Sequence, residues 1–383
     1  MTVEGPRPAT LKEIPAVVAL ANSVFRPRGN ASMSDEYPLL YAKENVENLR
    51  IFADDGRPIS LVAMFERDII LAGTRHRSCA IGSVCTDPEC RGQGLATRLV
   101  DDARAKALRD GCDVFLISGG RGLYRRLGYV DVGGYRRAVV DPGGLPARTG
   151  YRAREWTPWD LPVLVRLHSA EPVRFARTPE DYLTMLECRR IHNGAGDTRL
   201  ICPGSGEPVA YVTFRTPGAA GLEEHEISVD EMAGSRWAIV QALKALCKEY
   251  RARRAFVEFL DCDAEMAALA RSLKWKVGPR GFRGTLGIIE PERFWQACAP
   301  LFEERLGAER FGRLKLKTNG GLHVEYGRER LKVDGMTGLT QLVFLPEGRR
   351  DELALGLLAD SELAGVLAEL FPLPLVSYGL NYV

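Results

Sequence analysis

The chain has 383 residues, more than one hydrophobic core usually organises, so we expect two or three domains. Hydrophobic residues make up 45% of the chain and charged residues 27%, a composition typical of soluble globular proteins. The 52 Lys and Arg residues nearly balance the 50 Asp and Glu residues, and the formal net charge of +2 argues against general binding to nucleic acid or to a membrane surface. Any basic site is therefore expected to be local.

The cysteines and histidines give no sign of a metal site. Nine cysteines are scattered and never form a CxxC pair, which argues against zinc or a disulfide framework and favours reduced thiols in a cytoplasmic protein. The five histidines (His76, His168, His192, His225 and His323) follow no metal-ligand spacing. The N-terminus has charges beside a very short apolar run, and no later segment is long and apolar enough to span a bilayer, so we expect neither a signal peptide nor a membrane span.

The first part of the chain predicts a mixed set of helices and strands. The expected elements, in chain order, are helices over 11–25 and 37–49, strands over 50–66 with a hairpin turn at 54–56, a strand region over 70–86, a helix over 95–111, a buried strand over 113–118, a short helix over 122–128 and a strand over 129–140. The helix after residue 94 has the clearest pattern, because Leu95, Leu99, Ala103 and Ala107 recur every four residues.

After the break marked by Pro142 and Pro146, a similar order begins again. The expected elements are helices over 157–173 and 178–191, strands over 207–216 and 222–230, a long helix over 235–252 and a strand over 254–260. The repeated order favours an internal duplication, although two unrelated α/β blocks would fit the same pattern. We divide the chain into domains 1–146, 147–289 and 290–383, the last a small α+β domain with an apolar C-terminus that we expect to be docked.

The stretch RGQGLA, residues 91–96, combines an arginine, two glycines and the start of a helix. A helix start binds anions, because its first N–H groups are unpaired. A dinucleotide fingerprint fits only partly, since Thr97 stands where the third small residue belongs, and the GK[ST] of a P-loop is absent. The simplest alternative is that the arginine is solvated and that the glycines only relieve backbone strain at the helix start. The second block has DEMAGSRWA at this place, without the arginine and glycine cradle.

Arg91, Gly94 and Ala96 resemble the R/Q-x-x-G-x-G/A loop of the GCN5-related N-acetyltransferases (GNAT), and the surrounding order of elements resembles that family across the first block. The resemblance implies acetyl-CoA as co-substrate, with backbone N–H groups on the pyrophosphate and a splayed strand along the pantetheine arm. The residues it implies for acetyl-CoA are Ser83, Val84, Cys85, Thr86, Arg91, Gly92, Gln93, Gly94, Leu95, Ala96, Thr97 and Ser118.

The segment GGRGLYRRLGYV places Tyr124 where family members often have a tyrosine that meets the thioester sulfur. A phenol there can donate a proton to the departing thiolate, while strand N–H groups hold the oxyanion. The alternative is an ordinary packing aromatic.

The whole chain resembles the Eis-like (enhanced intracellular survival) acetyltransferases, which have an active GNAT block, a degenerate one and a third domain similar to sterol carrier proteins. The expected fold class is therefore α/β (α+β), with tandem GNAT-like mixed-sheet domains followed by a small sterol-carrier-protein-like domain. The resemblance implies a hexamer, and a C-terminal carboxylate, here that of Val383, as candidate base, where better-known members end in phenylalanine. Other carboxylates considered as base are Asp35, Glu36 and Glu66.

The expected activity is transfer of an acetyl group to a primary amine on a small molecule or peptide: an aminoglycoside, a polyamine or a lysine. A non-catalytic scaffold whose third domain binds an apolar ligand is the alternative from another class. An intact loop beside Tyr124 favours the enzyme, because a scaffold requires neither.

Overall fold

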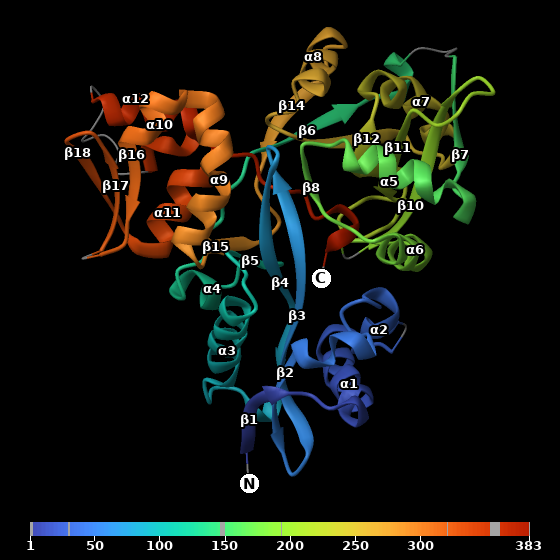
Figure 1. The fold of residues 1–383 in the computed structure, drawn as a ribbon. Helices are drawn as coiled ribbons and strands as arrows, with labels where there is room; N and C mark the ends of the chain where they lie inside the picture. The colour runs from blue at the N-terminus through green and yellow to red at the C-terminus, as the bar shows by residue number, and fades with distance from the viewer. Residues whose placement is uncertain are drawn as a thin grey trace. The chain divides into compact units, whose positions relative to one another are not determined.

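The computed structural model describes residues 3–29, 31–145, 150–192, 194–319, 321–352 and 361–382. The chain forms two compact units, coloured along the chain in Figure 1. The first unit comprises Met1–Ser32, Leu40–Gly134 and Gly281–Leu375, and the second comprises Met33–Leu39, Tyr135–Arg280 and Val376–Val383. No helix in the described ranges is long and apolar enough to cross a membrane.

The first unit contains the elements of the first block together with those that follow residue 281. Its elements are β1 (Val3–Pro8), α1 (Ile14–Phe25), β2 (Leu49–Asp54), β3 (Arg57–Leu71), β4 (Thr74–Thr86), α3 (Leu95–Arg109), β5 (Val114–Ile117), α4 (Gly122–Arg126), β15 (Thr285–Ile288), α9 (Pro291–Leu306), α10 (Ala308–Arg313), β16 (Leu314–Lys317), β17 (Leu322–Tyr326), β18 (Glu329–Val333), α11 (Gly335–Phe344) and α12 (Glu362–Leu370).

The main sheet of the first unit runs in the order β1-β2-β3-β4-β5-β15. Its strands are antiparallel except for the parallel pair β4 and β5, which α3 connects. Figure 1 shows α1 and α3 on opposite faces of β2, β3 and β4. Leu95, Leu99, Ala103 and Ala107 of α3 are all buried in one core with strand side chains, as the four-residue spacing predicts. The core therefore fixes both the start and the direction of α3.

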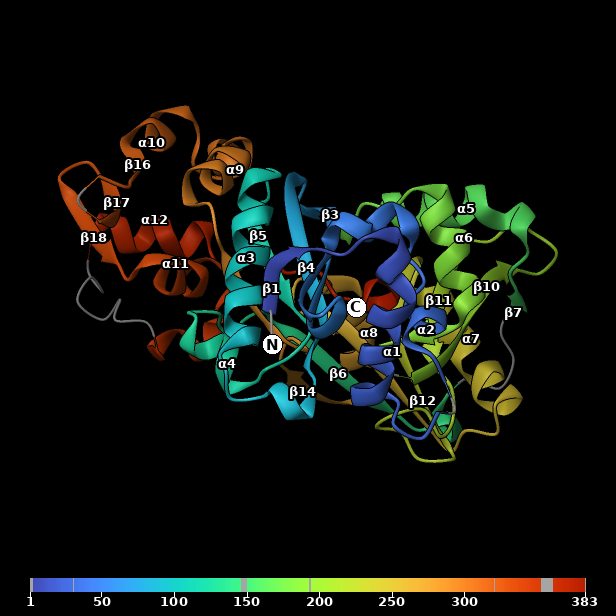
Figure 2. The same cartoon turned by 90° about the horizontal axis from the view of Figure 1, so that it is seen from below.

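The segment after β15 forms the remainder of the first unit. Strands β16, β17 and β18 make a separate antiparallel sheet, and α12 packs on β17, β18 and α9. Helix α11 lies against β15, and α9 lies against β4. Figure 2 shows α10, α11 and α12 gathered around this small sheet.

The second unit holds the elements of the second block and two short pieces from the chain ends. Its elements are α2 (Met33–Glu36), β6 (Tyr135–Val140), β7 (Tyr151–Glu155), α5 (Leu161–Ser169), β8 (Val173–Phe175), α6 (Pro179–Cys188), β9 (Arg190–Ile191), β10 (Gly194–Pro203), β11 (Ala210–Arg215), β12 (Glu226–Gly234), α7 (Arg236–Glu249), β13 (Arg254–Leu260), α8 (Ala264–Ser272), β14 (Lys276–Arg280) and the 3-10 turn Gly379–Asn381.

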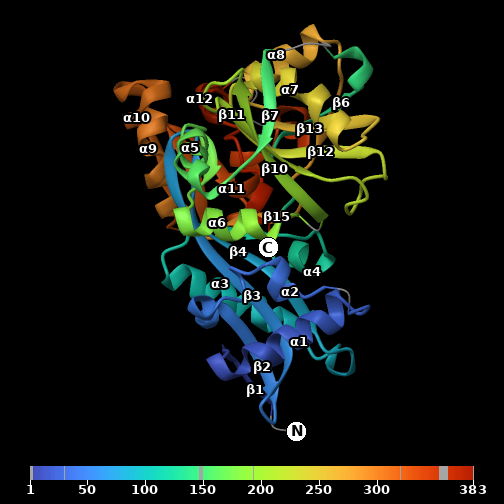
Figure 3. The same cartoon turned by 90° about the vertical axis from the view of Figure 1, so that its right-hand side faces the viewer.

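The second sheet runs in the order β14-β6-β13-β12-β11-β10-β7, and Figure 3 shows several of these strands side by side. It repeats the order of the first sheet: three antiparallel strands, a helix, a parallel strand and a short helix. Each sheet also contains a strand from the domain that the sequence assigns to the other sheet. Strand β6, which lies inside the expected domain 1–146, pairs with β13 in the second sheet, and β15, from 147–289, pairs with β5 in the first. The boundaries expected at 146 and 289 therefore do not coincide with the sheets.

Candidate active site

Strands β4 and β5 separate at the end of the first sheet. Their parallel pairing runs from Ser78 and Val114 to Ile81 and Ile117, whereas β4 continues to Thr86 beside β3 alone. A β-bulge at Ser83, whose φ is +51°, shifts the register at this point. Beyond Ile81, β4 therefore offers main-chain groups that β5 does not pair, which suits an extended ligand carrying amide groups.

The loop that follows β4 leads into the start of α3. Gly92 and Gly94 have φ values of +80° and +74°, and a Cβ built on either would meet no atom within 4 Å. Gly94 is the N-cap of α3, and no side chain among the described residues caps this helix. Leu95 is buried while Arg91 to Gly94 are exposed. The first N–H groups of α3 therefore face open space, which is the arrangement that binds phosphate.

Arg91 shapes this loop from within. Its Nε donates to the backbone oxygen of Thr86 at 3.3 Å, which ties the loop to the end of β4. Asp87 caps the 3-10 turn Pro88–Cys90, which lies between β4 and Arg91, by accepting from the N–H of Glu89 at 3.1 Å. These contacts fix the path from the strand to the glycines.

Tyr124 lies on α4, directly after the turn that ends β5. Its side chain is buried, and its ring lies against Gly119, where a Cβ would stand 3.3 Å from Tyr124 Cε2. Tyr124 belongs to one hydrophobic cluster with Val84, Leu95 and Ile117. The structure thus brings together four separate segments: the end of β4, the start of α3, the end of β5 and α4.

Residues 5–131 match the family described as "Acetyltransferase (GNAT) domain". Residues 5–131 form a GNAT acetyltransferase domain. Because of this domain, the chain is an enzyme of the N-acetyltransferase class. The GNAT family uses acetyl-CoA or another acyl-CoA. Comparison with curated proteins gave no match.

Solved structures resemble the chain in fold at low sequence identity. A GCN5-related N-acetyltransferase from Anabaena variabilis is 16% identical, with a TM-score of 0.66 and 96% of each chain covered. Eis1 from Mycobacterium abscessus is 14% identical, with a TM-score of 0.60, 98% of this chain and 99% of that chain covered. A probable N-acyltransferase from Enterococcus faecalis is 14% identical, with a TM-score of 0.60 and coverages of 77% and 74%. The predicted α/β (α+β) class with tandem GNAT-like mixed sheets is confirmed.

The residues of the GNAT domain fit a CoA thioester. The uncapped helix start and the open positions at Gly92 and Gly94 suit a pyrophosphate. Ser83 Oγ, at the bulge, is buried and finds no hydrogen-bond partner among the described residues, so a polar ligand group would satisfy it. Burial raises the pKa of the Cys85 thiol to about 12, so the thiol stays protonated and does not act as a nucleophile. Ser118 lies at the end of β5, with its Oγ 3.4 Å from the backbone oxygen of Ile81.

Among the carboxylates considered as base, Glu66 lies away from this cluster. Glu66 forms an ion pair with Arg77 at 2.7 Å and lies near Lys106 in the last turn of α3, at the opposite end of that helix from Gly94. Burial raises the pKa of Glu66. Asp35 and Glu36 belong to the second unit.

Of these two, Glu36 is buried and pairs with Arg190 at 2.9 Å, while Asp35 accepts from Ser34 Oγ. Val383 lies outside the described residues. Across the described ranges, no group of three or more His, Cys, Asp or Glu residues could hold a metal ion.

The corresponding helix start in the second unit is closed to anions. The N–H of Gly234 donates to Glu171 at 2.9 Å, that of Trp237 to Glu265 at 3.2 Å and that of Ala238 to Ser235 Oγ at 3.2 Å. Protein oxygens thus occupy the places where phosphate oxygens would bind. The sequence signals one part of this difference, because DEMAGSRWA lacks the arginine-then-glycine arrangement of the first block. It does not show the partners Glu171, which follows α5, and Glu265 of α8.

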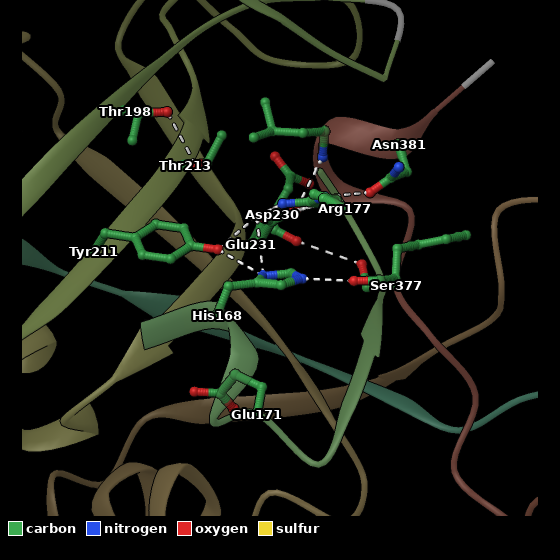
Figure 4. Close-up of polar contacts among 12 residues, drawn as sticks. His168, Glu171, Arg177, Thr198, Tyr211, Thr213, Asp230, Glu231, Ser377 and Asn381 are labelled. Atoms are coloured by element: carbon green, nitrogen blue, oxygen red, sulfur yellow. Dashed lines mark hydrogen bonds and ion pairs between the residues drawn. The ribbon is translucent and has the colours of Figure 1, made fainter. Parts of the chain in front are cut away.

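A pocket of about 240 Å³ lies in the second unit, beside the ends of β12 and β13. Arg177 and Glu231 form a two-point ion pair at its edge, and Glu231 also accepts from Tyr211 Oη at 2.8 Å (Figure 4). Burial alone would raise the pKa of Glu231, but the Arg177 guanidinium outweighs it and holds the pKa at about 2. Burial, reinforced by the charge of Arg177, lowers the pKa of His168 to about 3. The cluster is therefore ionised at Glu231 and neutral at His168.

The end of the chain docks on this cluster. The N–H of Leu380 donates to Glu231 Oε2 at 3.1 Å, and Arg177 Nε donates to Asn381 Oδ1 at 2.6 Å. Gly379 has a φ of +48°, and a Cβ there would meet Glu231 Oε2 at 2.0 Å. The docked C-terminus expected from its apolar composition is confirmed as far as residue 381. Arg177 and Glu231 were not found from the sequence, because no local pattern links either of them to residues 380 and 381.

Proposed function

We propose that the protein is an acetyl-CoA-dependent N-acetyltransferase that transfers the acetyl group to a primary amine by direct attack on the thioester. The observation that carries this proposal is one cluster in the GNAT domain: a splayed β4, an uncapped glycine-rich helix start and a buried tyrosine.

Each segment has a role in this proposal. The N–H groups of residues 92–97 bind the pyrophosphate, and the free side of residues 83–86 binds the pantetheine arm. An amine nitrogen attacks the acetyl carbonyl carbon, the carbon–sulfur bond breaks, and Tyr124 gives its phenolic proton to the sulfur. Main-chain N–H groups of the splayed strand stabilise the oxyanion. The attacking nitrogen loses one proton to a base or to water, and the Tyr124 phenolate takes up one proton from solvent before the next turnover.

We assign Val383 as the group that orients the amine and relays its proton. An ordinary terminal carboxyl has a pKa of about 3.3 to 3.7, too acidic to deprotonate an ammonium efficiently by itself, so relay through water is its expected role. The assignment of Val383 comes from the Eis-like resemblance. Residues 377–381 are held in the second unit by hydrogen bonds to Asp230, Glu231 and Arg177.

The proposal extends to the class and setting of the enzyme. By its Eis-like resemblance we propose aminoglycosides, polyamines or lysine side chains as acceptors, a sterol-carrier-protein-like domain within 290–383, a hexameric assembly and a cytoplasmic location. GNAT enzymes in general act on small-molecule or peptide amines. The match of Eis1 over 98% of this chain supports the fold on which this extension rests.

The test is thiol release from acetyl-CoA across a panel of polyamines, aminoglycosides, lysine peptides and arylamines, with CoA affinity measured by calorimetry. We expect release with at least one amine class and CoA binding in a single site per chain. Absence of both would contradict the enzyme and favour the scaffold alternative.

A further inference from the structure

The helix that carries Tyr124 is too short to hold its own position. Helix α4 has only five residues, Gly122–Arg126, and is preceded by Gly119 and Gly120 and followed by Gly128. A helix of one turn is unstable in isolation, since its few hydrogen bonds do not offset the entropy of forming it. The location of the tyrosine therefore depends on whatever holds the two ends of α4.

The entry to α4 is held by β15. Thr285 Oγ1 donates to the backbone oxygen of Gly119 at 3.1 Å, and the Thr285 side chain is completely buried. The two backbones approach closely here, because a Cβ on Gly284 would meet the oxygen of Ile117 at 2.0 Å. Gly119 is also the residue on which the Tyr124 ring rests. The turn beneath the ring is thus hydrogen-bonded to a strand from the end of the expected second block.

The exit from α4 is held by α11. Thr337 Oγ1 donates to the backbone oxygen of Gly128 at 3.0 Å. Gly128 has a φ of +87°, and a Cβ there would stand 3.0 Å from Thr337 Oγ1 and 3.1 Å from Met336 Cε. The absence of a side chain at Gly128 is what lets α11 reach the end of α4.

The two supports are themselves joined. Thr340 Oγ1, one turn along α11, accepts from the N–H of Ile288 on β15 at 2.9 Å and donates to Met336 O at 2.6 Å. A Cβ on Gly287 of β15 would meet Met336 Sδ at 2.7 Å. Strand β15 and helix α11 therefore act on α4 as one rigid body.

We propose that Thr285 and Thr337 are positioning residues that hold the phenol of Tyr124 in register with the thioester sulfur. This inference rests on the proposed function of Tyr124. It makes the segment 285–340 part of the catalytic apparatus of a GNAT domain whose family match ends at residue 131. Loss of either hydroxyl leaves the ring packed but removes one of the hydrogen bonds that hold the segments flanking α4, and a displacement of about 1 Å in a catalytic group can cost about 100-fold in rate.

The experiment compares Thr337→Val and Thr285→Val, which keep side-chain shape and remove the hydroxyl, with Thr337→Ser and Thr285→Ser, which keep it. We expect kcat to fall by roughly 10- to 100-fold in each valine variant, with KM for acetyl-CoA and CoA affinity within about twofold of the parent. Serine should restore most of the rate. Thr213→Val is the matched control, because it removes a buried threonine contact, to Thr198 Oγ1 at 3.0 Å, in the second unit; its kcat should stay at the parent value.

A double-mutant cycle with Tyr124→Phe separates this inference from the proposed function. If Thr337 acts through Tyr124, then Thr337→Val should cost little further rate in the Tyr124→Phe background. An equal fall in both backgrounds, or an unchanged kcat in both valine variants, would overturn the positioning role while leaving a slow Tyr124→Phe enzyme. A fully active Tyr124→Phe enzyme would instead overturn the proposed function, and this inference with it.

Discussion

Arg177 and Glu231 face each other inside the second unit through two hydrogen bonds of 2.7 and 2.6 Å, and the same two side chains bind the last turn of the chain. The guanidinium of Arg177 is nearly inaccessible, with 1% of its side chain exposed. A buried ion pair of this kind is costly to break from one side, because the remaining charge stays buried without its partner.

Replacing Glu231 with glutamine should therefore loosen both the second unit and the tail. We expect the free energy of unfolding to fall by about 3 kcal/mol and the backbone amides of residues 378–382 to exchange hydrogen faster. Denaturant unfolding and hydrogen exchange with mass spectrometry measure the two effects. Glu369→Gln, which breaks an exposed pair with Arg310, is the control and should change neither quantity appreciably. Unaltered exchange in the tail of the Glu231 variant would show that the ion pair does not hold it.

His168 should make the second unit sensitive to mild acid. Its pKa is about 3 when folded against an ordinary value of 6.5, so between these values the unfolded chain binds a proton that the folded one does not. Stability is then fully present above about pH 6.5 and declines as the pH falls toward 3, by up to about 1.4 kcal/mol per pH unit from this group. The lowered pKa of Glu231 adds a loss of the same sign below its ordinary value of 4.5.

His168→Gln should flatten the decline between pH 6 and pH 5, since glutamine can still hydrogen-bond to Tyr211 Oη and Phe175 O without titrating. Urea unfolding at a series of pH values measures the slope. An identical slope in parent and variant would assign the acid sensitivity to other groups.

Gly94→Val should abolish CoA binding, because a side chain at the open helix start stands where the pyrophosphate would approach. The backbone strain of a valine at positive φ costs about 1 to 2 kcal/mol, so the variant should still fold. Gly111→Val is the matched control. Gly111 follows the other end of the same helix, and with a φ of +87° a valine there has the same backbone strain. Gly234, at the corresponding helix start of the second unit, is unsuitable as a control, because a Cβ there would meet Val209 O at 2.2 Å. Calorimetry that finds equal CoA affinity in the two variants would contradict the pyrophosphate assignment.

The structure shows why the loop and helix could be predicted and the sheet partners could not. The spacing of Leu95, Leu99 and Ala103 is a local pattern, and the hairpin at residues 54–56 follows from a turn signal, with Asp54 opposite Arg57. The pairing of β15 with β5 instead depends on residues about 170 positions apart, which no local pattern encodes.

The helix expected over 37–49 was wrong for a similar reason. The segment forms turns and the short 3-10 helix Lys43–Asn48. The amide of Asn45 donates to Leu40 O at 2.7 Å and to Met64 O at 2.9 Å, so a contact with a distant strand replaces helical hydrogen bonds. Of the candidate site, the residue types were readable from the sequence, whereas the bulge at Ser83 and the threonines that hold α4 required the three-dimensional pairing.

Deletion of Val383 should lower turnover strongly while the protein stays folded and binds acetyl-CoA, because the terminal carboxylate is assigned to the acceptor amine. A C-terminal affinity tag should act in the same way, and an N-terminal tag should leave the rate unchanged. Steady-state rates on the three forms decide the assignment. Full activity with the carboxylate displaced would remove Val383 from the mechanism.

The most direct measurement is the single-turnover rate of acetyl transfer by Tyr124→Phe under conditions where chemistry limits the rate. The substitution keeps the ring that packs on Gly119 and removes the hydroxyl group that would donate the proton. We predict a fall of roughly two to four orders of magnitude, with acetyl-CoA affinity unchanged. An unchanged transfer rate would contradict the account and leave Tyr124 as a packing residue.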